Sequence, residues 1–147
     1  MSTDTSKRAE LEAIAMSYVE GLLSAQGANI PFSPDVVRAH LIVTPGKPMA
    51  WQMTKGADEI RSNVQREKLT ARKNLRTIVD VENSNVVILW ESGMEIPYAR
   101  HITIMDRFVI KDNLITEIEI ISIPQGEEFQ RTDFPGWDAM VKDASGE

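Results

Sequence analysis

The sequence predicts an α+β fold in which a curved antiparallel sheet wraps around N-terminal helices to form a cone. Residues 6–25 and 56–70 carry helical patterns, and the second half of the chain holds four strand-like stretches. The connections between these strands are only a few residues long. They therefore join antiparallel neighbours, because a parallel crossover needs about a dozen residues. Each helix must bury one apolar face, and laying both helices across one curved sheet buries both faces.

The first predicted helix covers residues 6–25. Its apolar residues recur every three or four positions, which is the spacing of one helical face. Gly27 follows it, at a place where a left-handed backbone ends a helix at low cost. The apolar face consists of Leu11, Ile14, Ala15, Tyr18, Leu22 and Leu23.

A strand and a turn are expected between the two helices. Two prolines interrupt regular structure within residues 30–35, and residues 36–43 (VVRAHLIV) then have the β-branched composition of a strand. A short helical turn that begins at Ser33 is the alternative. Residues 45–48 (PGKP) predict a turn, and residues 49–53 predict a short strand or the wall of a loop.

The second predicted helix is followed by a meander of four strands. In residues 56–70 the side chains of Ala57, Ile60 and Val64 face inward. The strands are expected at residues 75–82, 85–92, 99–110 and 114–123, with compact turns at 82–85 and 111–113.

The composition indicates a single domain without metal or cofactor. A chain of 147 residues, 42% hydrophobic and 26% charged, is sufficient for one core, which we expect at about residues 9–123, followed by an irregular arm at 124–147. There is no cysteine, and the two histidines form no HxxxH or HxH pair, so we expect no metal site. No GxGxxG turn, P-loop or GxSxG elbow is present, and we expect no cofactor.

The charge balance and the start of the sequence limit the partners. The net charge of −6 disfavours a nucleic-acid binder, because such proteins need an excess of basic residues. The polar first residues lack the apolar core of a signal peptide, and no stretch approaches the roughly 18 apolar residues of a membrane span. We therefore expect a cytoplasmic protein that binds neither nucleic acid nor membrane.

Four pieces of the sequence carry a resemblance to a known superfamily. The chain resembles the nuclear-transport-factor-like (cystatin-like α+β cone) superfamily, in particular its SnoaL-like and ketosteroid-isomerase-like branch, over about Leu11 to Ile123. The resemblance implies a pocket between the helices and the concave sheet, a homodimer, no cofactor, and diverse functions. The pieces are YVEGLLSAQG at 18–27, FSPDVVRAH at 32–40, KGADEIRSNV at 55–64 and HITIMDRFVIKDNLITEIEI at 101–120.

Asp106 is a candidate catalytic acid or base. Side chains alternate along a strand, so Asp106 is the one acid in a row that includes Ile102, Ile104, Phe108 and Ile110. Apolar surroundings penalise the charged form of a carboxyl group, which would then keep its proton for catalysis. The resemblance implies the position of a protonated, oxyanion-binding aspartate. The alternatives are that Asp106 pairs with an arginine, or that its strand is an edge with this face in water.

Tyr18 and His40 are the other two catalytic candidates. Histidine exchanges a proton near neutral pH without a large pKa shift, which suits a general base. The resemblance implies that Tyr18 holds the position of an oxyanion-binding tyrosine, and that His40 stands where the isomerases carry a base aspartate. The alternatives are that Tyr18 is a core residue and that His40 is hydrogen-bonded for structural reasons.

The remaining candidates are side chains that can line a ligand pocket. Large, adaptable apolar side chains suit a flat or apolar ligand, with core packing as the alternative. The basic residues between Arg61 and Arg76 are interpreted as a solvated face and given no binding role. The candidate substrate-binding residues are Trp51, Met53, Trp90 and Phe108.

These residues give two hypotheses. The first is a cofactor-independent isomerase, cyclase or dehydratase that transfers protons on a small apolar carbonyl compound, polyketide- or terpenoid-like, with His40 as the base and Tyr18 and neutral Asp106 stabilising an enolate. The second is a non-catalytic homodimeric module that binds a small ligand or a protein. We expect the three side chains to share one cavity if the first is correct.

Overall fold

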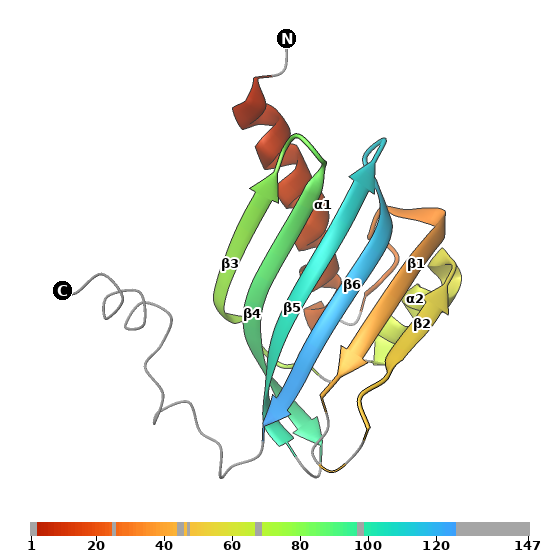
Figure 1. Cartoon of the computed structure of the whole chain (residues 1–147), viewed down its shortest axis with the longest axis vertical. Coiled ribbons are helices and arrows are strands. Elements are labelled where there is room, and N and C mark those ends of the chain that lie inside the picture. The colour runs from red at the N-terminus through yellow and green to blue at the C-terminus, as the bar shows by residue number, and fades with distance from the viewer. Residues whose placement is uncertain are drawn as a thin grey trace, which may run out of the picture.

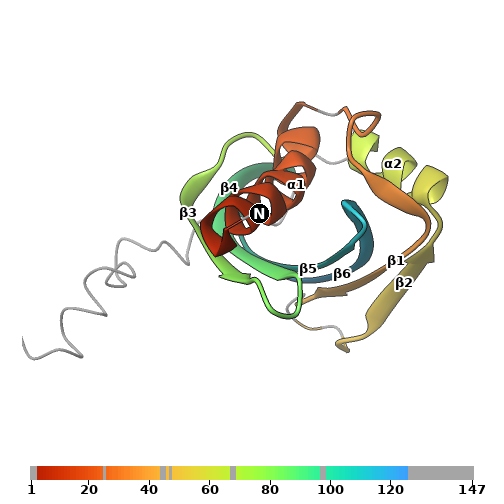
Figure 2. The same cartoon turned by 90° about the horizontal axis from the view of Figure 1, so that it is seen from above.

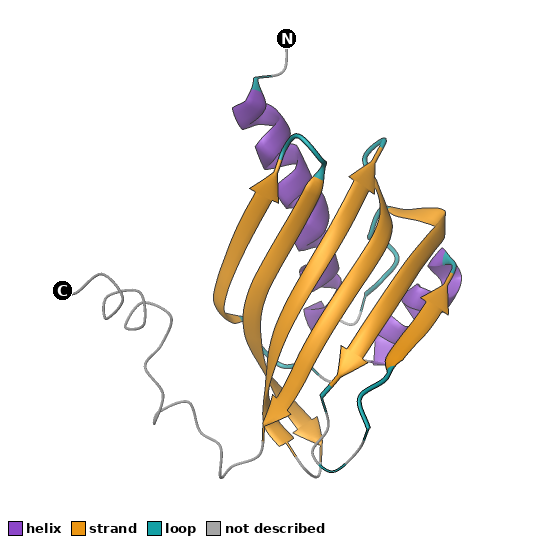
Figure 3. Cartoon of the chain, viewed as in Figure 1, coloured by secondary structure: helices purple, strands orange, loops and turns teal. Residues whose placement is uncertain are grey.

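The computed structural model describes residues 3–24, 26–43, 46, 48–66, 69–96 and 99–125. Within them a long helix is followed by six strands, with a second helix after the second strand (Figures 1 and 3). The elements are α1 (Asp4–Ser24), β1 (Phe32–Ile42), β2 (Trp51–Lys55), α2 (Ala57–Arg66), β3 (Lys73–Asp80), β4 (Asn85–Ile96), β5 (Ala99–Lys111) and β6 (Leu114–Gln125).

The six strands form one curved sheet in the order β2-β1-β6-β5-β4-β3. The predicted meander from β3 to β6 is confirmed, with each pair antiparallel. The segment from Phe32 to Ile42 is a strand throughout, so the alternative of a helical turn at Ser33 is wrong. One pairing was not predicted: β1 runs parallel to β6, beside which it lies in Figure 1.

The sheet curls around α1, as Figure 2 shows from above. An apolar core of side chains from the helices and the sheet lies between them. The helix α1 presents its predicted apolar face to the sheet, and α2 packs mainly against β1. Ala57, Ile60 and Val64 of α2 are buried, as the sequence predicts. The observed architecture is therefore the predicted α+β cone with the helices on the concave side.

The turn between β5 and β6 has the conformation that a tight hairpin requires. Asp112 and Asn113 have φ angles of 51° and 63°. Two consecutive residues with positive φ form the turn whose twist matches that of antiparallel strands, and Asn and Asp tolerate this conformation. The compact turn predicted at 111–113 is therefore confirmed.

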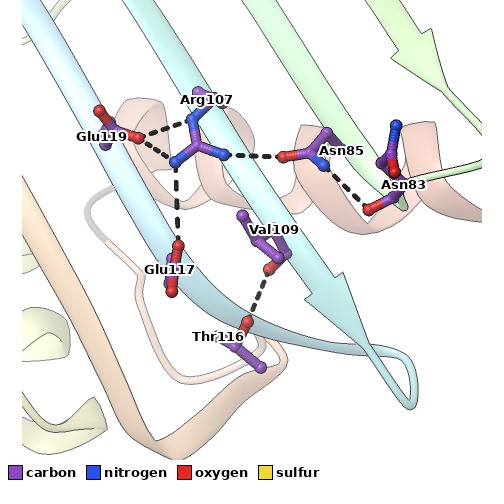
Figure 4. A network of polar contacts seen from close by, with 7 residues as sticks. All are labelled: Asn83, Asn85, Arg107, Val109, Thr116, Glu117 and Glu119. Carbon is purple, nitrogen blue, oxygen red and sulfur yellow. Dashed lines mark hydrogen bonds and ion pairs between the residues drawn. The ribbon is translucent and has the colours of Figure 1, made fainter.

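The convex face of the sheet has a polar part and an apolar part. In the polar part Arg107 donates hydrogen bonds to Glu119 and to Oδ1 of Asn85 (2.8 Å from Nη1) and lies 3.8 Å from Glu117 (Figure 4). The apolar part is a row of residues paired across five neighbouring strands, which we call the convex apolar row. It consists of Leu89, Met105, Ile121, Leu41 and Trp51.

Most of the irregular arm predicted at residues 124–147 lies outside the described residues, which end at Gln125. The first two residues of the predicted arm, 124 and 125, belong to β6. Of the turn predicted at 45–48, residues 45 and 47 lie outside the described residues, and the described Gly46 has a φ angle of 75°.

Candidate functional site

Tyr18, His40 and Asp106 line one small cavity inside the cone, which we call the inner chamber. Tyr18 comes from α1, His40 from β1 and Asp106 from β5, so three separate elements bring them together. The cavity volume is about 30 Å³. This is room for about one or two water molecules. The other lining residues are Leu22, Leu69, Ile102, Ile104, Ile120 and Ser122.

Asp106 is fully buried on the concave face of β5. It belongs to the inward-facing row predicted from strand alternation, and β5 lies between β4 and β6, so its strand is not an edge. The indole Nε1 of Trp90 donates a hydrogen bond of 2.8 Å to Oδ2 of Asp106. The carboxyl group therefore sits in an apolar interior with one of its oxygens held by a neutral donor.

Tyr18 points its hydroxyl group toward β1. Nη1 of Arg38 donates a hydrogen bond of 3.3 Å to this hydroxyl oxygen. The ring packs edge-on against Phe108, with centroids 5.3 Å apart, and against Phe32 at 6.3 Å. Such edge-to-face packing fixes the ring, so the hydroxyl group has a defined position beside Arg38.

His40 stands between the inner chamber and a larger hollow. Its Nε2 lies 2.7 Å from Oγ of Ser122, close enough for a hydrogen bond in either direction. Burial, and then the positive charge of Arg38, lower the pKa of His40 from 6.5 to about 4. Both causes disfavour the imidazolium form. At pH 7 the imidazole is neutral, which is the form that accepts a proton.

The larger hollow, which we call the outer pocket, has a volume of about 330 Å³. It shares His40, Ile102 and Ser122 with the inner chamber, so these three side chains separate the two spaces. Two arginines and several neutral polar groups line it, and none of its described lining residues is acidic. The lining residues are Arg38, His40, Ile42, Gln52, Thr54, Asn63, Arg66, Ile102, Ser122 and Pro124.

The four predicted substrate-binding residues lie elsewhere. Trp51 and Met53 are exposed on β2, while Gln52 and Thr54, which alternate with them, line the outer pocket. Trp51 pairs with Leu41 and thereby belongs to the convex apolar row. Trp90 and Phe108 are buried core residues that contact Asp106 and Tyr18, respectively.

The site also contains a residue that the sequence analysis did not single out. Arg38 is buried, lies two positions before His40 on the same face of β1 and lines the outer pocket. Side chains two positions apart on a strand share a face, so the sequence places Arg38 on the same side of β1 as His40. This spacing could have identified Arg38 as a site residue. Within the described ranges no three His, Asp or Glu side chains are grouped to hold a metal ion. None of the described helices is long and apolar enough to cross a membrane.

Solved structures described as having a cystatin-like fold or as NTF2-like share this fold, in which a curved sheet packs over a long helix. The predicted α+β cone is thus confirmed as a fold. Residues 4–122 match the family described as "Domain of unknown function (DUF8021)", so the chain belongs to this family. No protein among the curated ones matches the chain.

Several solved structures share the fold at low sequence identity. A "putative isomerase" from Bacillus subtilis is 9% identical, with a TM-score of 0.60 over 82% of this chain and 89% of that one. A "putative polyketide cyclase" from Xanthomonas campestris pv. campestris is 12% identical, with a TM-score of 0.58 over 87% and 96%. An NTF2-like protein from Burkholderia xenovorans LB400 is 10% identical, with a TM-score of 0.59 over 78% and 90%. At these identities the likeness establishes the fold alone.

Proposed function

We propose that the protein is a cofactor-independent enzyme that moves a proton on a small carbonyl compound, as an isomerase, cyclase or dehydratase does. The observation that carries the proposal is the shared inner chamber, where a neutral imidazole, a phenol and a buried carboxyl group meet. These groups supply a base and two hydrogen-bond donors, which are the parts that enolate chemistry needs. The "putative isomerase" and "putative polyketide cyclase" of the same fold are consistent with this class of reaction.

The volumes suggest how a substrate is arranged. The inner chamber has room for little more than a water molecule, whereas the outer pocket reaches the lower end of the range of small-molecule sites. The body of the substrate would therefore occupy the outer pocket, and its carbonyl oxygen would replace water in the inner chamber. The polar groups that line the outer pocket favour a substrate with more polar substituents than the largely apolar carbonyl compound expected from the sequence.

The proposed roles follow from this arrangement. His40 removes a proton from the carbon next to the carbonyl group, and the C–H electron pair forms the enolate. The hydroxyl group of Tyr18, polarised by Arg38, and the protonated carboxyl group of Asp106 donate hydrogen bonds to the enolate oxygen. The imidazolium then returns the proton to another carbon in isomerisation, or to a leaving hydroxyl group in dehydration.

The test is exchange of hydrogen for deuterium next to the carbonyl group in D₂O, followed by NMR on a panel of small ketones and enones. This assay detects the first step, which all three reactions share. His40→Ala is expected to lower the exchange rate at least about a hundredfold, the scale of lost general-base catalysis. His101→Ala is the matched control, since His101 is exposed and lies outside both cavities. Equal rates in wild type and His40→Ala would refute the proposal.

A second candidate function is non-catalytic binding by a homodimer. The specific observation in its favour is that buried side chains, of which Trp90, Tyr18 and Phe108 are the largest, pack the interior of the cone and leave only a small inner chamber. A protein that binds a panel compound tightly but exchanges none of its hydrogens would have this function instead.

A further inference from the structure

We infer that the outer pocket binds the carboxylate group of a small organic acid and that Arg38 is the positive charge that holds it. The inference rests on the proposed function only in calling this acid a substrate. The binding itself is argued from Arg38 and its surroundings.

Arg38 is a buried charge without a counter-charge in the described part of the chain. Its exposed fraction is 5%, so it is cut off from most of the water that would solvate it. Its one protein hydrogen bond there goes to the neutral hydroxyl group of Tyr18, and Nε has no partner. A guanidinium group stays charged at any ordinary pH, and a buried unpaired charge is costly. A bound anion would remove this cost.

The surroundings of Arg38 favour an anion as well. The protein carries a net charge of −6, yet among the residues that the structure describes none that lines the outer pocket is acidic, and Arg66 of α2 lines it beside Arg38. Asn63, Gln52 and Thr54 add neutral groups that can donate hydrogen bonds to oxygen. The pocket is therefore a locally positive hollow in an acidic protein.

A carboxylate fits this pocket better than a phosphate does. Arg38 offers a planar fork of donors whose Nη1 is already engaged by Tyr18, and a planar carboxylate matches such a fork. Phosphate sites usually add a helix N-terminus or a set of backbone N–H groups. The α2 residues in this pocket, Asn63 and Arg66, come from the C-terminal end of that helix.

Binding at Arg38 would also act on the proposed base. The charge of Arg38 is the second cause that lowers the pKa of His40. An anion that pairs with Arg38 offsets this charge and makes His40 a stronger base when the acid is bound. The carboxylate would thus hold the substrate in the pocket. It would also make His40 more basic toward the carbon next to the carbonyl group.

The experiment is calorimetric titration of the protein with short keto acids, each compared with its own methyl ester, and with inorganic phosphate. We expect at least one acid to bind at least about tenfold more tightly than its ester, the scale of a charged hydrogen bond. Arg38→Met is expected to abolish this preference, and Arg72→Met to keep it, because Arg72 is exposed and pairs with Glu20. Arg38→Met should unfold at a temperature no lower than wild type in the absence of ligand, since an unpaired buried charge is removed.

Three results would overturn the inference: no acid binds more tightly than its ester, the preference survives Arg38→Met, or phosphate binds more tightly than every acid. The exchange assay and these titrations, both run on the wild-type protein, separate this inference from the proposed function. Acid-selective binding in a protein that catalyses no exchange would refute the enzyme and keep the anion site. Exchange without acid selectivity would do the reverse.

Discussion

The lowered pKa of His40 predicts how the stability of the folded protein depends on pH. This pKa falls from 6.5 to about 4 in the folded protein, because burial and Arg38 both disfavour the imidazolium form. The unfolded chain therefore takes up a proton as the pH falls through 6.5, whereas the folded protein does so only near pH 4. The folded state loses stability across this window, by up to about 3 kcal/mol for a pKa difference of this size. Above pH 6.5 both states are neutral at this residue and its contribution is fully present.

Urea unfolding of wild type and His40→Gln, measured from about pH 7.5 to pH 4, isolates this contribution. The difference in unfolding free energy between the two proteins should shift by up to about 3 kcal/mol in favour of His40→Gln as the pH falls. His40 shares the two cavities with several polar or charged residues of the described part of the chain. They are Arg38 on β1, Ser122 on β6, Tyr18 on α1, Asp106 on β5, Asn63 and Arg66 on α2, and Gln52 and Thr54 on β2. Asp106 is an acidic residue that lines the same chamber, so the pair of proteins is compared again in an Asp106→Asn background. A difference that is independent of pH in both backgrounds would refute the reasoning.

Three further predictions concern stability and assembly. Trp90→Phe should lower the unfolding free energy by about 1–3 kcal/mol in urea, because the buried Asp106 loses the indole donor; an unchanged midpoint would contradict this. Gly21→Ala should also destabilise, by about 1–3 kcal/mol, although alanine favours helices, since its Cβ would lie 2.6 Å from Cδ1 of Ile30; a higher melting temperature would exclude the clash. We expect the wild-type protein to form a homodimer whose interface is the convex apolar row, and Met105→Lys to be a monomer, because a charge there would be buried in the interface. Sedimentation measures both, and a monomeric wild type would refute the dimer.

The sequence predicted those features of the fold that depend on local patterns. Helical periodicity located α1 and α2, and short connections required the meander from β3 to β6. The parallel pairing of β1 with β6 was not predicted, because no local pattern records which distant strand a segment will join. That pairing places His40 next to Ile120, so the neighbours of the site were beyond the reach of sequence reasoning.

The candidate site was predictable to the same extent. Alternation along β5 correctly placed Asp106 on the inner face with Phe108. The orientation of Trp51 and Met53 depends on the register between β1 and β2, which the sequence does not reveal, and the structure turns both to the convex side. Arg38 was overlooked because a lone arginine in a strand is usually exposed, and its burial became visible only with the sheet in place.

The parallel contact between β1 and β6 has a consequence for synthesis on the ribosome. His40 and Ser122 are 82 positions apart, and they face each other across this contact. Nascent α1, β1 and α2 leave the exit tunnel long before the strand that completes the wall of the pocket has been translated. The outer pocket is therefore completed late, and we expect early folding intermediates to expose Arg38 to water and to leave the edge of β1 that pairs with β6 open.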